Sequence, residues 1–134
     1  MSHTVEVCLK YSGTLEELRT KIAEVLGVQF THYERPNASL RSYYGRLLTI
    51  DVELSVNYLE TDRELNFADF QYVLSTRVAG HVCAQRLMEV QLPLTDTVGL
   101  LLCHYLSVEV MVTIETQELH ARYLPDGPNR RSNC

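Results

Sequence analysis

The sequence has no tryptophan and no apolar run long enough to cross a membrane. Its longest apolar stretch lies around residues 98–103, whereas a membrane helix needs roughly 20 such residues. The first residues do not combine a basic segment with an apolar run, so no secretory signal is expected. These absences predict a cytoplasmic protein that does not bind a membrane.

Motifs of common chemistries are also missing. No Walker A, GxGxxG or GxSxG motif occurs, and no histidines stand at HExxH, HxH or i,i+4 spacing. The four cysteines, Cys8, Cys83, Cys103 and Cys134, have no CxxC spacing. Cys103 and His104 are adjacent, but neighbours on a helix point about 100° apart, so they do not form a catalytic pair. We therefore predict no catalytic residue, no metal site, no cofactor and cysteines that stay reduced.

Basic residues are in the minority, with 12 Lys and Arg against 17 Asp and Glu, a net charge of −5. A general nucleic-acid binder needs a basic face to meet phosphate, so this class is excluded, whereas a basic protein partner is compatible. The 134 residues fit one domain that can fold without a metal or disulfide. We assign residues 1–124 to that domain. Residues 125–134, with two prolines, a glycine and no apolar anchor, are expected to form a flexible C-terminal tail.

An amphipathic helix is predicted soon after the first strand. Thr14 stands three residues before Glu17, the spacing of a capping box, and Gly27 is a typical C-terminal stop. Apolar residues recur between them at helical spacing. The predicted buried stripe is Leu15, Leu18, Ile22, Val25 and Leu26.

Alternating patterns predict the strands. Residues 5–11 place apolar side chains on one side and Glu6 and Cys8 on the other, which indicates a half-buried strand. Residues 50–57 give the clearest alternation, with one apolar and one acidic face. Gly45 is expected to mark a bulge or bend, and the other glycines turns or bends. Further strands are expected near residues 28–33, 41–48, 70–78, 108–114 and 117–123.

The segment before the second helix is ambiguous. Residues 80–92 fit either a strand or a short helix, and Pro93 is expected to end them. A cap at Thr95 or Asp96 then predicts a helix to residue 107, with Tyr105 in its buried stripe. Because several strands follow one another without a helix, we predict an α+β fold. It consists of a mostly antiparallel sheet of five to seven strands with two helices packed on one face.

Acidic residues and tyrosines gather in one part of the chain. Residues 51–69 contain six acids and one base, Arg63, a local balance of −5 that equals the net charge of the whole chain. Such a patch favours encounter with a basic protein surface, and tyrosine suits interfaces because it is large, rigid and able to hydrogen-bond. An acidic strand that simply keeps the protein in solution is the competing interpretation. The candidate partner-binding residues are Asp51, Glu53, Glu60, Asp62, Glu64, Asp69, Tyr43, Tyr44 and Tyr58.

A family resemblance points the same way. Residues 25–28, 42–48, 50–57 and 70–74 read VLGV, SYYGRLL, IDVELSVN and FQYVL. This arrangement resembles small immunity proteins of bacterial polymorphic-toxin and contact-dependent growth inhibition systems. The resemblance covers less than half of the chain. The resemblance implies a cytosolic protein that binds and neutralises a cognate toxin domain, often a nuclease. A nuclease needs a basic groove for phosphate, which an acidic inhibitor can occupy.

Two other functions are compatible with the sequence. The first is a small enzyme with a pocket on an open sheet face, in which Asp51 or Glu53 acts with a histidine. The second is a structural or adaptor subunit that forms a homodimer through an apolar sheet face. As an inhibitor, the protein is expected to be a monomer or a homodimer.

Overall fold

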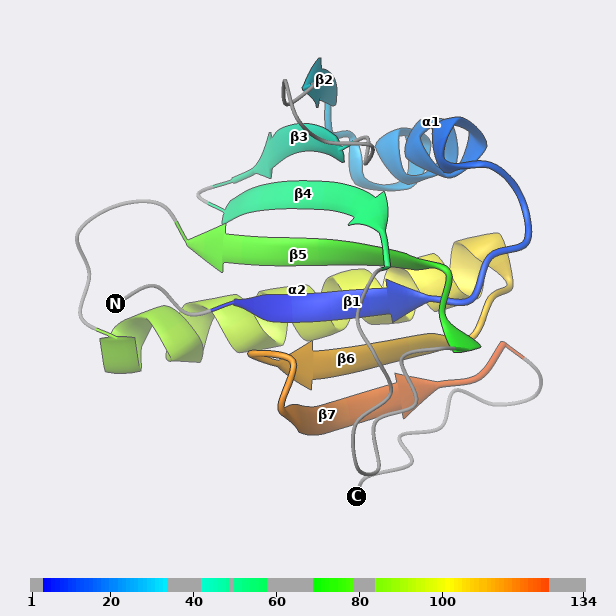
Figure 1. The fold of residues 1–134 in the computed structure, drawn as a ribbon. Coiled ribbons are helices and arrows are strands. Elements are labelled where there is room, and N and C mark those ends of the chain that lie inside the picture. Colours follow the sequence, from blue (N-terminus) through cyan, green and yellow to red (C-terminus); the bar gives the residue numbers. More distant parts are fainter. Residues whose placement is uncertain (1–3, 34–41, 49, 58–68, 79–83, 126–134) are drawn as a thin grey trace.

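A single antiparallel sheet organises the chain. The computed structural model, shown in Figure 1, describes residues 4–33, 42–48, 50–57, 69–78 and 84–125. Its seven strands run in the order β2-β3-β4-β5-β1-β6-β7, and every pairing between neighbours is antiparallel. The strands are β1 (Val5–Leu9), β2 (Thr31–Tyr33), β3 (Ser42–Leu47), β4 (Ile50–Val56), β5 (Tyr72–Val78), β6 (Val110–Ile114) and β7 (Glu118–Tyr123).

Two helices, α1 (Leu15–Leu26) and α2 (Ala84–Leu106), cover one face of this sheet (Figure 1). The predicted α+β fold is therefore confirmed. The opposite face is called the outer face below. Neither helix of the described residues is long and apolar enough to cross a membrane. Of the predicted C-terminal tail, residues 126–134 lie outside the described residues.

The first helix begins and ends where the sequence predicts. The Glu17 amide donates to the Thr14 hydroxyl at 3.1 Å, and the Thr14 amide donates to the Glu17 carboxylate at 3.3 Å, which completes the capping box. Gly27 ends the helix with φ +69°, a conformation that suits glycine. The side chains of Leu15, Leu18 and Ile22 are buried in the core between the helices and the sheet.

The second helix differs from its prediction. It starts at Ala84 and runs through Pro93 without a break. The two expected cap residues bind other elements instead: the Thr95 hydroxyl lies 2.9 Å from that of Thr76 on β5, and Asp96 accepts a hydrogen bond from Tyr123 on β7. Pro93 has no amide hydrogen, so the backbone carbonyl of Glu89, four residues earlier, loses its helical hydrogen bond. Both residues are exposed, so water can bind that carbonyl instead.

The buried stripe of α2 also differs at one position. Tyr105, expected in the stripe, is exposed and lies edge-on to the His104 ring. The stripe follows an i,i+4 spacing through Val98, Leu102 and Leu106, which leaves residue 105 off the face that meets the sheet.

Two glycines allow close packing rather than turns or bulges. A Cβ on Gly99 would lie 2.8 Å from Val112 Cγ2, so glycine lets α2 approach β6 closely. A Cβ on Gly45 would collide with Val28 Cγ1, while the β3–β4 register continues through Gly45 without a shift. The expected bulge at Gly45 is therefore wrong, as is the expected turn at Gly99.

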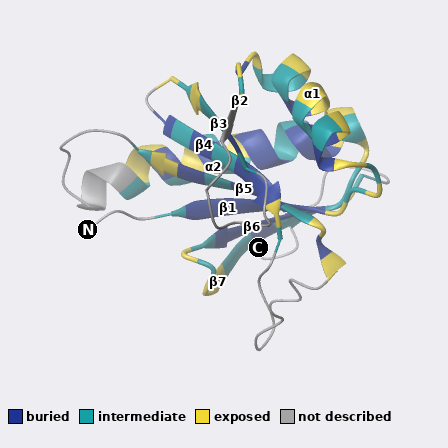
Figure 2. Cartoon of the chain, turned by 45° about the horizontal axis from the view of Figure 1, so that its top comes forward, coloured by how far each residue is buried: buried dark blue, intermediate teal, exposed yellow. Residues whose placement is uncertain are grey.

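The central strand β1 is buried on both faces, as the dark blue ribbon in Figure 2 shows. The half-buried interpretation of this strand is therefore wrong. On the outer face, Cys8 packs with Phe70, Val73 and Met111 in a second apolar cluster. Burial, and then the charge of Glu6, raise the pKa of the Cys8 thiol to about 12. The thiol is thus neutral and structural at physiological pH.

The β6–β7 turn has an uncommon backbone conformation. Glu115 and Thr116 both have positive φ, 51° and 58°, and the Gln117 amide donates to the Ile114 carbonyl at 3.0 Å. Such two-residue turns usually contain Asn and Gly, because a β-branched residue is strained there. The buried Glu6 carboxylate accepts the Thr116 amide at 2.7 Å and so holds the turn to β1.

Candidate functional site

The predicted acids of β4 lie on the outer face. Val52 and Leu54 belong to the core beneath the helices, so Asp51 and Glu53 point the other way. Across from them on β3, Tyr44 is paired with Glu53 in the ladder, and Arg46 is paired with Asp51. On the other side, β5 places Ser75 beside Glu53 and Arg77 beside Asp51. We call these six residues the β3–β4–β5 surface: Tyr44, Arg46, Asp51, Glu53, Ser75 and Arg77.

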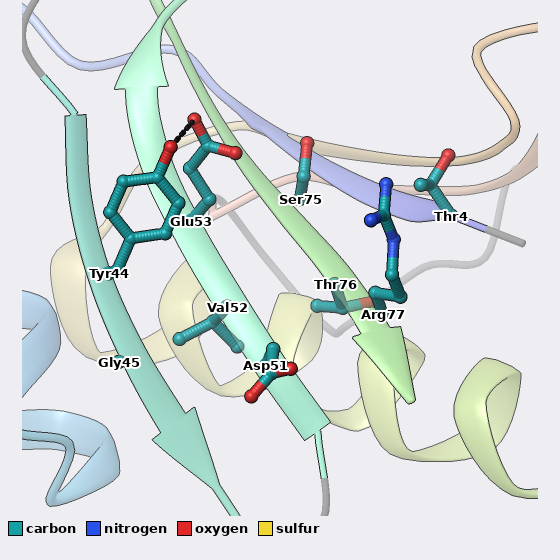
Figure 3. A pocket seen from close by; sticks show the side chains of 9 residues that line it. All are labelled: Thr4, Tyr44, Gly45, Asp51, Val52, Glu53, Ser75, Thr76 and Arg77. Atoms are coloured by element: carbon teal, nitrogen blue, oxygen red, sulfur yellow. Dashed lines mark hydrogen bonds between the residues drawn. The ribbon is translucent and has the colours of Figure 1, made fainter. Parts of the chain in front are cut away.

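A cavity of about 260 Å³ opens at this surface (Figure 3). Polar side chains from β3, β4 and β5 and from the residue before β1 surround it. It is lined by Thr4, Tyr44, Gly45, Asp51, Val52, Glu53, Ser75, Thr76 and Arg77.

The two carboxylates of the cavity have different partners. Asp51 forms an ion pair with Arg46, with 2.9 Å between Nε and Oδ1, and both side chains are about half exposed or more. Glu53 instead accepts a hydrogen bond from the Tyr44 hydroxyl at 3.1 Å (Figure 3). Among the described residues no cation pairs with Glu53, so its negative charge is oriented but not neutralised.

This surface is less uniformly acidic than residues 51–69 suggest. Arg46 and Arg77 lie beside the two acids because β3 and β5 flank β4 in the sheet. Sequence reasoning counted charges along one segment and could not include neighbours that only strand pairing brings together. The surface thus carries acidic and basic side chains next to one another rather than a uniformly negative charge.

The remaining predicted residues are dispersed. Tyr43 faces the helices, is 4% exposed and lies under the Arg19 guanidinium at 4.8 Å, so it does not contribute to the β3–β4–β5 surface. Asp69 is exposed in the segment before β5. The other four, Tyr58, Glu60, Asp62 and Glu64, lie outside the described residues.

A second polar cluster, which the sequence did not reveal, joins α2 to β7. The Tyr123 hydroxyl donates to Asp96 Oδ1 at 2.6 Å, and His120 Nε2 lies 3.7 Å from the same oxygen. These residues come from elements with no motif spacing between them, so only the packing of β7 against α2 unites them. Cys103 is buried while its neighbour His104 is exposed, so the two side chains point to different surroundings.

The described residues contain no group of three or more His, Cys, Asp or Glu side chains placed to hold a metal ion. The chain matches no protein-family model, no curated protein and no solved structure.

Proposed function

We propose that this protein is an immunity-type inhibitor that binds a basic toxin domain, such as a nuclease, through the β3–β4–β5 surface. The main support is Glu53, a half-buried carboxylate that Tyr44 orients and that no cation of the described residues neutralises. The chain's net charge of −5 favours encounter with a basic partner. Because the residues stand on paired strands, the surface is preorganised, which lowers the entropic cost of binding. The proposed setting is the cytoplasm of a bacterial cell.

The enzyme hypothesis is less well supported by the same cavity. It would use Asp51 or Glu53 with a histidine, but the described residues that line the cavity include none. Asp51 is already ion-paired with Arg46. Carboxylate, phenol and hydroxyl groups arranged around a shallow recess are suited to holding a partner's side chain.

The adaptor hypothesis requires an apolar face for a second copy. The exposed large apolar side chains of the described residues are scattered over the β3–β4 turn, the end of β4, both halves of α2 and the residue after β7: Leu48, Val56, Val90, Tyr105 and Leu124. Size-exclusion chromatography at several concentrations separates a homodimeric adaptor from a monomeric inhibitor. A constant monomer mass would contradict the adaptor, whereas a mass that doubles with concentration agrees with both the adaptor and a homodimeric inhibitor.

The central test pairs the full chain with the C-terminal domain of the protein encoded by the adjacent reading frame. We expect co-expression of the chain to restore growth of cells that produce this domain. Calorimetry should show binding that weakens as salt rises, because exposed charges are screened. Asp51→Lys and Glu53→Lys should each weaken binding at least tenfold, since each places like charge against a basic surface.

Glu24→Lys supplies the matched control, because Glu24 is an exposed acid on α1, on the helix side of the sheet. It changes the net charge by the same amount and should leave the affinity unchanged. Equal effects of all three substitutions, or binding insensitive to salt, would show that the β3–β4–β5 surface is not the interface. Failure to restore growth would contradict the inhibitor function itself.

A further inference from the structure

The size of the cavity indicates what kind of group fits it. Its volume of about 260 Å³ lies below the roughly 300–1,000 Å³ typical of sites for drug-sized ligands. A cavity of this volume can hold one long side chain of a protein partner. The cavity also opens on a sheet face that a flat protein surface can cover.

The charges of the cavity indicate the sign of that group. Asp51 is satisfied by Arg46, whereas Glu53 has only the neutral Tyr44 phenol as a partner among the described residues. Arg77 is the one cation among the described residues that line the cavity. It stands opposite Asp51 and diagonal to Glu53, and its side chain is exposed. A partly desolvated charge gains more from a counter-ion than an exposed one, so the entering group is expected to be a cation at Glu53.

The neutral groups of the cavity suit a guanidinium or ammonium. In Figure 3 the second Glu53 oxygen is directed away from Tyr44, toward the side lined by the hydroxyls of Ser75 and Thr4, with the Arg77 guanidinium between these two in this view. An arginine presents five N–H donors in one plane and carries no acceptor, so carboxylate and hydroxyl oxygens are appropriate partners.

We propose that the cavity receives one arginine or lysine side chain of the partner protein, which forms an ion pair with Glu53. That the side chain comes from a partner protein rests on the proposed function, but the affinity of the cavity for a cation can be tested without the partner. Tyr44 fixes the Glu53 carboxylate by a hydrogen bond, and Asp51, which also lines the cavity, is held by its ion pair with Arg46. The side chain would therefore be an anchor residue of the complex.

The test titrates the full ¹⁵N-labelled chain with N-acetyl-L-arginine amide, whose only charge is the guanidinium. Its neutral isostere, N-acetyl-L-citrulline amide, is titrated in parallel. We expect millimolar affinity for the arginine compound, with the largest amide shifts at Tyr44, Glu53 and Ser75, and at least tenfold weaker binding of the citrulline compound.

Variants assign the effect to one carboxylate. Glu53→Gln keeps the shape and a carbonyl acceptor for Tyr44, and it should weaken binding of the arginine compound about tenfold. Glu24→Gln removes the same charge from α1 and should leave binding unchanged. Equal binding of arginine and citrulline compounds, or equal affinity of Glu53→Gln and the original chain, would overturn the proposal.

The two proposals fail in different ways. If the toxin domain binds with sensitivity to Asp51→Lys and Glu53→Lys but the arginine compound does not bind, the surface is the interface and the cavity is not an arginine pocket. If the arginine compound binds at Glu53 while no toxin domain is neutralised, the cavity chemistry stands and the inhibitor function fails. Better binding of a free zwitterionic amino acid than of the arginine compound would assign the cavity to a small ligand and overturn this proposal.

Discussion

Glu53 and Glu6 occupy one row of the outer face and have opposite environments. The strand registers place Tyr44, Glu53, Ser75, Glu6 and Thr113 side by side across five strands. Glu6 is 2% exposed and accepts hydrogen bonds from the Thr113 hydroxyl at 2.9 Å and the Thr116 amide at 2.7 Å. Glu53 borders a cavity and accepts one bond from a phenol. A carboxylate enclosed by donors from its own chain stabilises the fold, whereas one left beside an open space is available to another molecule.

The largest expected effect comes from Glu6→Ala. The substitution leaves the Thr113 hydroxyl and the Thr116 amide without their acceptor in a buried region and releases the β6–β7 turn. We expect a loss of about 2–4 kcal/mol in the free energy of unfolding. Urea denaturation followed by circular dichroism measures this loss. If Glu6→Ala costs no more than Glu53→Ala, the distinction between the two glutamates is wrong.

The next effect concerns Cys8, which lies beside Glu6 in the same closed region. Below pH 9.0 the thiol is protonated in both folded and unfolded chains, so it contributes no pH dependence. Between this value and about 12 only the unfolded chain loses the proton, so stability falls as the pH rises.

From pH 8 to pH 10, the original chain should lose about 1 kcal/mol more stability than Cys8→Ala loses over the same interval. Urea midpoints of both chains at the two pH values provide the measurement. The same slope in both would show that the thiol is accessible to solvent. Other groups also make stability depend on pH, such as Tyr72, whose pKa is raised mainly by burial. Their contribution is the same in both chains and cancels when the two are compared.

An effect of similar size, but a gain in stability, is expected at the turn that Glu6 holds. Replacing Glu115 and Thr116 with Asn and Gly supplies residues that favour positive φ, while the amide that donates to Glu6 is kept. The double variant should be about 1 kcal/mol more stable, mainly through relief of backbone strain. Thermal unfolding should show a melting temperature a few degrees higher. A lower temperature would mean that the Glu115 or Thr116 side chain contributes more than the strain costs.

Glu53→Gln should have the smallest effect on stability. The side chain borders open space, and the glutamine carbonyl can still accept from Tyr44, so a change within about 0.5 kcal/mol is expected. Together with loss of arginine binding, this result would separate function from folding at one residue. A loss above 1 kcal/mol in the same urea experiment would instead make Glu53 a structural residue like Glu6.

Local patterns predicted the parts of the fold that local interactions determine. The capping box at Thr14 and Glu17 and the stop at Gly27 set α1 within a single segment, so the sequence was sufficient there. In α2, tertiary contacts of Thr95 with Thr76 outweigh the local signals of Pro93 and the expected cap. Strand alternation likewise could not show that β1 is covered on its second face.

In the candidate site, too, the sequence predicted the features that depend on one strand and missed those that depend on strand pairing. A period of two residues was enough to place Asp51 and Glu53 on one face of β4. Their neighbours Tyr44 and Arg46 depend on the register between β3 and β4, and Arg77 on that between β4 and β5. Because the alternation of one strand does not reveal its register with the next, the sequence placed Tyr44 among the candidate residues but predicted neither its hydrogen bond to Glu53 nor the nearby arginines.

The position of β1 in the sheet also affects how the chain folds during synthesis. Val5 pairs with Thr76 on one side and Ile114 on the other, so the central strand joins segments that lie far apart in the sequence. Sheets that rely on such distant pairings form slowly, because long loops must close before the contacts are made. A nascent chain that has not yet produced β6 has an unpaired edge on β1, which is a site for aggregation. The domain can therefore cover both edges of β1 only after translation has passed β6, and it can complete its sheet only after β7.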